Sequence, residues 1–207
     1  EYLAAMMTCE QENTDKILSC IADCRSHDIT VLPPDVNQSE QDFTIAGEQQ
    51  IRFGLGAVKN VGAGAIESIV RSRSQEGLFT SLYDFCRRID SRRVNKRVIE
   101  SLAKCGAFDF TEAPRSQLFG NIDRAMNMAS SHQRDRQTGQ ARLFDTISNA
   151  AANVDDDSLE SVPVWNEQAM LSYEKEALGF YISGHPLTQF DDLLKIYATE
   201  DTASLIE

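Results

Sequence analysis

Apolar residues recur every three or four positions along most of this chain, which is the spacing that places them on one face of an α-helix. The pattern predicts two helices at the start, over residues 1–12 and 13–27. Asn13 is predicted to be the N-cap of the second helix, because its side chain can accept a backbone N–H bond. The apolar stripe of that helix is predicted to be Ile17, Leu18, Ile21 and Cys24.

A small amount of β-structure is predicted next. Residues 29–32 begin as a strand, and the strand ends because Pro33 and Pro34 cannot continue a ladder of hydrogen bonds. Residues 43–45 and 50–53 are predicted to pair as a hairpin, and we expect that hairpin to be the only sheet. The predicted fold class is therefore mainly α with a small β-hairpin.

Residues 51–73 carry the most informative local pattern. A helix-length run leads to a tight glycine turn at residues 62–64, and a second helix follows directly. Glycine permits backbone angles and close approaches that side chains forbid, and a helix that begins at a turn has unpaired N–H groups in its first turn. The pattern is typical of a helix-hairpin-helix element, whose turn can cradle a phosphate. The apolar face of the second helix is predicted to be Ile66, Ile69 and Val70.

The order helix, turn, helix is repeated about thirty residues later, which indicates an internal duplication. Thr80 is predicted to cap one helix, a basic turn follows at residues 91–95, and the next helix ends at Gly106, a suitable C′ residue. Neither copy can bury its apolar face alone, so we expect a tandem helix-hairpin-helix unit over residues 51–110, flanked by further helices. The buried positions of the second copy are predicted to be Leu82, Phe85, Cys86, Ile89, Val98, Ile99, Leu102 and Ala103.

Two more helices are predicted after residue 110, separated by a long loop. Pro114 fits the first turn of the first helix. Its stripe is predicted to be Leu118, Ile122, Ala125, Met126 and Ala129. Residues 130–161 are polar, small and charged, and are predicted to be a flexible loop. The last helix is predicted to resume near Pro163 and to stop at Gly184. Its stripe is predicted to be Trp165, Ala169, Tyr173, Ala177 and Tyr181.

The charge of the chain is unevenly distributed. A net charge of −12 argues against general attraction to nucleic acid. Between Cys86 and Lys104, however, seven basic residues stand against two acidic ones, and a local basic patch indicates a directed contact.

No apolar run approaches membrane-spanning length, so no membrane is expected. The five cysteines lack a C-x-x-C spacing, which suits free thiols in the cytoplasm. The first residues read as the middle of a helix, so we expect a piece of a longer protein.

The first turn supplies the first set of candidate DNA contacts. Its main-chain N–H groups are predicted to bind a phosphate oxygen, which fixes position on a duplex and reads no sequence. The alternative is a glycine turn that only packs two helices closely. The residues predicted to bind DNA here are Lys59, Asn60, Gly62, Ala63 and Gly64.

The second turn lacks the glycines and offers side chains in their place. Three or four phosphate contacts from it would make affinity fall steeply with salt, by about 0.9 in log–log slope per contact. The alternative is a solvated charged turn, which is what most charge runs are. The residues predicted to bind DNA here are Arg92, Arg93, Asn95, Lys96 and Arg97.

An apolar island lies inside the predicted flexible loop, in the form Q-x-x-L-F. Its residues are Gln140, Leu143 and Phe144. Two large apolar side chains in a segment without a core of its own suit a pocket on a partner. They could equally fold back onto the helices of this protein, and spacing alone does not decide between the two.

No feature of the sequence indicates catalysis or a metal site. His27, His132 and His185 are scattered and have no Ser or Cys partner at a readable spacing. Cys20, Cys24 and His27 could share a helix face, but they lack a fourth ligand, so buried thiols are the simpler interpretation. The acids at 155–157 are expected to be solvated.

Several strings taken together resemble one family. They are P-P-D-V-N (33–37), I-R-F-G-L-G-A-V-K-N-V-G (51–62), V-N-K-R-V-I-E-S-L-A-K-C-G-A-F-D (94–109), G-Q-A-R-L-F (139–144) and E-K-E-A-L-G-F-Y-I-S-G-H-P-L (174–187). In this order they resemble the C-family replicative polymerases, the alpha subunits of bacterial DNA polymerase III. The resemblance runs essentially from end to end of the chain.

The resemblance implies a domain organisation. Residues 1–50 would be the end of the fingers domain, and 51–110 the tandem helix-hairpin-helix unit that holds the duplex leaving the active site. Residues 111–190 would complete the clamp-binding domain, and 191–207 would begin the linker to an OB-like domain. The resemblance also implies that Gln140, Leu143 and Phe144 dock on the sliding clamp, which favours partner binding over folding back.

The resemblance further implies where catalysis lies. The family's catalytic aspartates and their Mg²⁺ belong to a palm domain outside this chain, so no cofactor is expected here, although the parent would be a DNA-directed DNA polymerase. The expected partners are double-stranded DNA, the sliding clamp and other holoenzyme subunits. The alternative function is a helix-hairpin-helix repair enzyme such as a glycosylase, but the G-P-D string expected of that class is absent.

Overall fold

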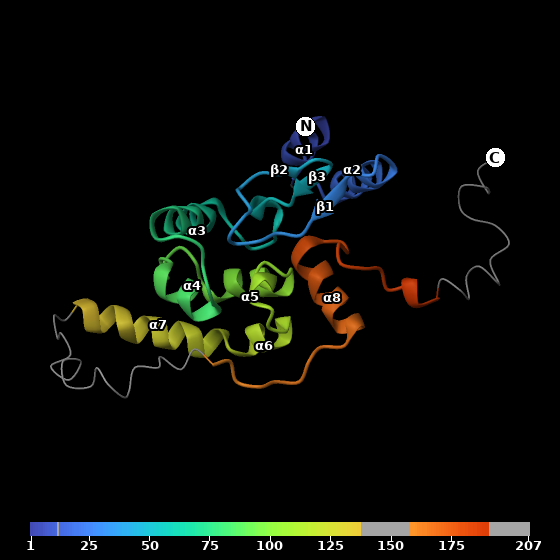
Figure 1. Ribbon diagram of the computed structural model, residues 1–207. Helices are drawn as coiled ribbons and strands as arrows, with labels where there is room; N and C mark the ends of the chain where they lie inside the picture. The colour runs from blue at the N-terminus through green and yellow to red at the C-terminus, as the bar shows by residue number, and fades with distance from the viewer. Residues whose placement is uncertain (12, 138–157, 191–207) are drawn as a thin grey trace, which may run out of the picture.

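The computed structural model describes residues 1–11, 13–137 and 158–190, and this part of the chain is mainly helical (Figure 1). The α-helices are α1 (Tyr2–Cys9), α2 (Thr14–Ser26), α3 (Ala63–Glu76), α4 (Leu82–Arg88), α5 (Lys96–Lys104), α6 (Arg115–Gly120), α7 (Ile122–Gln137) and α8 (Glu167–Leu178). The short 3-10 helices are η1 (Leu55–Ala57), η2 (Asp109–Thr111) and η3 (Thr188–Phe190). The predicted mainly α fold class is confirmed.

The sheet has three strands rather than the two of a hairpin. Strands β2 (Thr44–Gly47) and β3 (Gln50–Arg52) form the predicted antiparallel hairpin, with an irregularity between Ile45 and Gly47. Strand β1 (Thr30–Leu32) then pairs in parallel with the other side of β3. The prediction that the hairpin is the whole sheet was therefore wrong, because local pattern does not reveal a pairing between segments about twenty residues apart.

The two N-terminal helices follow the predicted pattern with one exception. The side chain of Asn13 accepts the Lys16 N–H at 3.3 Å, as an N-cap does. Leu18, predicted to be buried, is 41% exposed, and Cys20 takes the buried place. Each residue of a helix is rotated by about 100° from the one before it, so Leu18, next to the buried Ile17, faces the solvent.

The first helix of the first hairpin is much shorter than predicted. Residues 50–52 are β3, and only η1 represents the helix before the turn. A Cβ atom on Gly54 would lie 2.5 Å from the Gln41 carbonyl oxygen, and one on Gly56 would lie 2.9 Å from the same oxygen. These two glycines therefore serve a close approach between chain segments, and glycine is a poor residue for a regular helix.

The second hairpin consists of α4, a basic turn and α5. The N-cap of α4 is Ser81, whose hydroxyl accepts the Asp84 N–H at 3.0 Å, so the prediction of Thr80 was wrong by one residue. Thr80, the residue before the N-cap, instead donates its N–H to the Asp84 carboxylate at 3.1 Å, so Asp84 also pairs a backbone donor ahead of the helix. Gly106 has φ of 83°, as predicted for the residue that ends α5.

The helix predicted after Pro114 is divided into α6 and α7. Asn121 lies at the junction, where its side chain donates to Gln117 O at 2.8 Å and to Glu160 O at 3.0 Å. Its Oδ1 also accepts the Glu160 N–H at 2.9 Å. These bonds hold the returning segment beside the junction. Since α7 continues to Gln137, the predicted start of the loop at residue 130 was wrong; residues 158–161 have no regular secondary structure, and residues 138–157 lie outside the described part.

Helix α8 begins after Asn166, whose side chain accepts the Ala169 N–H at 2.8 Å. It ends at Leu178 because Gly179 has φ of 95°, so the predicted end at Gly184 was wrong. Trp165 and Tyr181, predicted as part of its stripe, flank the helix. Its buried residues are Leu171, Glu174, Ala177 and Leu178.

Buried aromatic rings run through the core. Phe53 contacts Phe43 at a centroid distance of 4.6 Å and Phe180 at 5.8 Å, which joins the sheet region to the segment after α8. Phe85 contacts Phe79 and Phe108, both at 4.9 Å, which joins α4 to the end of α5. One cluster of buried residues thus extends from α1 to the segment after α8. None of the described helices is both long enough and apolar enough to cross a membrane.

Candidate nucleic-acid interface

The N-terminus of α3 presents bare backbone at the surface. Gly62 is the N-cap, without a side chain to cap the helix, and residues 62–64 are exposed. Their N–H groups form no hydrogen bond within the described ranges, since the first intrahelical bond is from Ala65 N to Gly62 O at 2.9 Å. A Cβ atom on Gly62 or Gly64 would meet nothing within 4 Å. An anion can therefore reach these N–H groups closely.

The left-handed residue of the first turn is Asn60, with φ of 68°, and not one of the glycines. Gly62 has φ of −83° and Gly64 lies in the helix. The expectation that these glycines provide special backbone angles was wrong; their contribution is the open surface above the N–H groups. Asn60 tolerates the left-handed conformation better than most residues do.

Lys59 stands beside this turn and is held by α8. Its N–H donates to the Ala177 carbonyl oxygen at 2.9 Å, while its side chain is exposed. A hollow of about 530 Å³ borders the turn and is lined by Thr14, Lys59, Asn60 and Gly62 among others. The Lys59 ammonium can thus supply positive charge beside the bare N–H groups.

The second turn is organised around Asp90. Its carboxylate accepts the Arg92 N–H at 3.0 Å, and its carbonyl accepts the N–H groups of Arg93 and Val94, both at 2.9 Å. The side chain of Asn95 accepts the Val98 N–H at 3.1 Å as the N-cap of α5. Asn95, which the sequence placed among the DNA contacts, therefore has its side-chain oxygen engaged in capping.

Two of the four cationic side chains at the second turn form ion pairs, and the other two do not. Arg93 is paired with Glu67 at 2.7 Å, and Lys96 with Asp123 at 2.7 Å. The hydrogen bond that Lys96 donates to the Asp123 carboxylate raises the pKa of the Lys96 ammonium. The exposed side chains of Arg92 and Arg97 form no ion pair or hydrogen bond among the residues that the structure describes. These two guanidinium groups are therefore the most available for an outside anion.

Part of the basic patch that the sequence showed is structural. The Arg88 guanidinium is buried, pairs with Asp84 at 2.9 Å and donates to the carbonyl oxygens of Ser72 and Gly77. Lys104 pairs with Glu176 at 2.8 Å. Both residues tie elements of the fold together, so the surface charge of the patch is smaller than the count of basic residues indicates.

The two hairpins are fixed to each other by reciprocal hydrogen bonds. Asn60 Nδ2 donates to Ser101 Oγ at 3.0 Å, so the loop of the first hairpin lies on α5. Asp90 N donates to Ser68 Oγ at 3.2 Å, so the loop of the second lies on α3. Ser68 and Ser101 are 33 positions apart, as are the N-caps Gly62 and Asn95. The duplication predicted from the sequence therefore forms one unit in space.

Three residues of this arrangement were missed by sequence reasoning. Ser68 and Ser101 join the two copies, and Glu67 neutralises Arg93. The available signal was the repeat itself, which places E-S at 67–68 and at 100–101. The predicted clamp-binding residues Gln140, Leu143 and Phe144 lie outside the described residues.

Comparison with known proteins agrees with this geometry. The family profile described as a helix-hairpin-helix motif matches residues 28–118. The DNA polymerase III subunit alpha of Vibrio cholerae is 39% identical over 190 residues, which cover 92% of this chain and 16% of that protein. The corresponding subunit of Neisseria meningitidis serogroup A is 40% identical over 205 residues, 99% of this chain and 18% of that protein. The subunit of Escherichia coli K12 is 35% identical over 190 residues, which cover 92% of this chain and 16% of that protein. The chain thus spans about a sixth of the length of these relatives.

Proposed function

This chain is homologous, over nearly its whole length, to one segment of DNA polymerase III alpha subunits, and we propose that it is the part of a replicative polymerase that grips duplex DNA and docks on the sliding clamp. The parent protein would be a DNA-directed DNA polymerase whose catalytic residues and Mg²⁺ lie in another domain. Other subunits of the polymerase complex would be further partners. Bacterial chromosomal DNA lies in the cytoplasm, which this function would make the site of action.

The DNA-binding proposal rests on the exposed N–H groups of residues 62–64, which have no hydrogen-bond partner among the residues that the structure describes. A helix N-terminus carries partial positive charge and donors that point outward, which suits a phosphate. Because Arg92 and Arg97 belong to a hairpin fixed to the first, they can reach phosphates of the same duplex. Contacts of this kind position a protein on DNA without reading its sequence.

A charge placed at the first turn tests this proposal. In Gly64→Asp the new carboxylate stands where the phosphate would lie, yet an acidic residue in the first turn of a helix is compatible with folding. Ser74→Asp adds the same charge to an exposed position near the other end of α3 and is the matched control. We expect Gly64→Asp to weaken duplex binding on the order of tenfold or more, and Ser74→Asp much less. Equal effects of the two variants would contradict the proposal.

The clamp contact is proposed to come from the segment that contains Gln140, Leu143 and Phe144. That segment joins Gln137, at the end of α7, to Ser158, whose carbonyl accepts a hydrogen bond from Arg124 near the start of α7. Leu143 and Phe144 in a pocket of the clamp would each contribute about 1.5–3 kcal/mol. Ordering of the segment offsets part of this gain, so the contact is weak alone and gains from effective concentration when the same protein also holds the DNA.

Binding to purified clamp tests this second contact. We expect Leu143→Ala combined with Phe144→Ala to abolish measurable clamp binding while duplex binding is retained. Arg142→Ala, within the same segment, is the control for a general effect of substitution there. Clamp binding that survives the double substitution would contradict the assignment. Incubation with a damaged duplex tests the glycosylase alternative, for which we expect no release of base.

A further inference from the structure

The most deeply buried carboxylate described, that of Glu174 on α8, has a full set of partners. The residue is 1% exposed. It accepts the backbone N–H groups of Ile182 and Ser183 and the Ser183 hydroxyl, and Arg115 Nη1 donates to it at 3.1 Å. Arg115 also pairs with Asp109 at 2.6 Å. Burial opposes the charge on Arg115, but Asp109 and Glu174 more than offset it, so the pKa of the guanidinium is raised.

These bonds close a loop around the C-terminus of α8. After Leu178 the chain reverses at Gly179, and Phe180 enters the core against Phe53 at 5.8 Å. Residues 182 and 183 then return to the Glu174 carboxylate, which lies about one turn before the end of the helix. Glu174 therefore fixes where the last turn of α8 lies, because a buried charge without these partners would be costly.

The last turn of α8 is in turn the support of the first hairpin. The Ala177 carbonyl oxygen accepts the Lys59 N–H at 2.9 Å, immediately before the left-handed Asn60. A Cβ on Gly179 would lie 2.8 Å from a Thr14 methyl carbon and 3.5 Å from Lys59 Nζ. The end of α8 thus packs between α2 and the turn that precedes the bare N–H groups.

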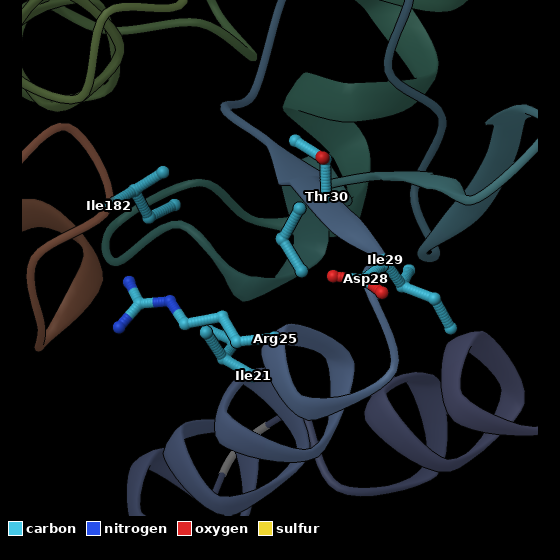
Figure 2. A pocket seen from close by; sticks show the side chains of 7 residues that line it. Ile21, Arg25, Asp28, Ile29, Thr30 and Ile182 are labelled. Carbon is cyan, nitrogen blue, oxygen red and sulfur yellow. The ribbon is translucent and has the colours of Figure 1, made fainter.

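The same loop also forms one wall of a second hollow. A cavity of about 390 Å³ is lined by α2, by residues 28–31 and by Ile182. Figure 2 shows the Ile182 side chain directed into this cavity and the Arg25 side chain extending from α2 toward Ile182. Ile182, in the loop that Glu174 closes, therefore faces α2 and β1 across this cavity.

We propose that Glu174 is a positioning residue for the phosphate-binding turn of the first hairpin. It acts by fixing the last turn of α8, whose Ala177 carbonyl holds Lys59 and so orients the N–H groups of residues 62–64. This inference rests on the proposed function only in its consequence for DNA. The positioning itself is a property of the fold and can be measured without DNA.

The test uses Glu174→Gln in the full chain, with Glu167→Gln, an exposed acid in the first turn of α8, as the matched control. The first measurement is hydrogen exchange of the Lys59 amide. We expect exchange to become faster on the order of tenfold in Glu174→Gln and to stay unchanged in Glu167→Gln. Ser183→Ala removes one bond to the carboxylate and is expected to give a smaller change in the same direction; it replaces Glu174→Gln if that variant does not fold.

The second measurement is a pair of double-mutant cycles on duplex affinity. Glu174→Gln is expected to be non-additive with Lys59→Ala and additive with Arg97→Ala, because only the first turn depends on the loop. Unchanged Lys59 exchange in the folded variants overturns the inference, as does additivity with Lys59→Ala. If Lys59 exchange rises but the unsubstituted chain binds no duplex, the positioning stands and the proposed function fails.

Discussion

Asn60 donates a 3.0 Å hydrogen bond from its side-chain amide to the hydroxyl of Ser101, and this bond joins the loop of one hairpin to the second helix of the other. The equivalent position in the first copy, Ser68, accepts from the loop of the second hairpin. The two N-termini that face solvent are thus held by one reciprocal set of bonds. The proposed contact of both with a single duplex requires a fixed relation of this kind.

The two roles of Asn60 can be separated by two substitutions. Asn60→Gly loses the hydrogen bond but keeps the left-handed backbone free of strain, so we expect a cost of about 0.5–1.5 kcal/mol in the free energy of unfolding. Asn60→Ala loses the bond and adds strain, for a cost about 1 kcal/mol larger. Urea unfolding of both variants measures the difference. Equal costs would mean that the φ of 68° contributes nothing to stability.

Gly64→Ala is predicted to separate stability from binding. The added Cβ meets nothing within 4 Å, and alanine is the better helix former, so the free energy of unfolding should rise by about 0.5–1 kcal/mol. The methyl group nevertheless stands over the N–H groups, so duplex affinity should fall several-fold. Ser74→Ala on the same helix is the control, with a small gain in stability and unchanged affinity. Unchanged duplex affinity in Gly64→Ala would argue that no phosphate approaches this turn.

Asp84 should make the stability of the chain depend on acid pH. Burial acts to raise the pKa of its carboxyl. The hydrogen bonds from the Thr80 N–H and from Arg88 lower the pKa by more than burial raises it, so the folded pKa lies below the ordinary value. Its stabilisation is therefore present above about pH 4 and is lost as pH falls through the folded pKa. We expect Asp84→Asn to cost about 1–3 kcal/mol at neutral pH and to flatten the loss of stability in acid, measured by urea unfolding. Parallel curves for the two proteins would contradict this role.

The cysteines should react very unequally in the native chain. Cys9 is exposed, whereas the other four are buried. Burial raises the pKa of Cys86 to about 12 and that of Cys105 to about 12, which keeps both thiols protonated and unreactive. Alkylation followed by mass spectrometry should therefore show rapid modification at Cys9, with the buried thiols modified only after unfolding. Rapid native modification of Cys105 would show that the core opens easily.

Local sequence pattern predicted those features that depend on local chemistry. Asn13 as a cap, Gly106 as the end of α5 and the β2–β3 hairpin follow from side-chain or turn preferences within a few residues. The duplication was also visible, because buried residues recur at matching positions in both copies. These are the cases in which sequence neighbours are also the physical partners.

The largest errors in the fold came from contacts between distant segments, whereas the cap of α4 and the end of α8 were misplaced by local choices. β1 pairs with β3, and Gly54 packs against Gln41, so neither could be deduced from its own neighbourhood. The break between α6 and α7 is stabilised by Asn121 bonding to Glu160, which is 39 residues away. At the candidate site, sequence identified the cationic residues, but which of them are neutralised depends on partners such as Glu67 and Asp123 from other helices.

We propose that both hairpins hold the backbone of one duplex. The most direct test is the salt dependence of affinity for two duplexes of unrelated sequence, measured for the native chain and for Arg92→Ala combined with Arg97→Ala. We expect equal affinities for the two sequences and a log–log salt slope reduced by about 0.9 for each arginine removed. A clear preference for one sequence, or a slope that the double substitution leaves unchanged, would contradict it.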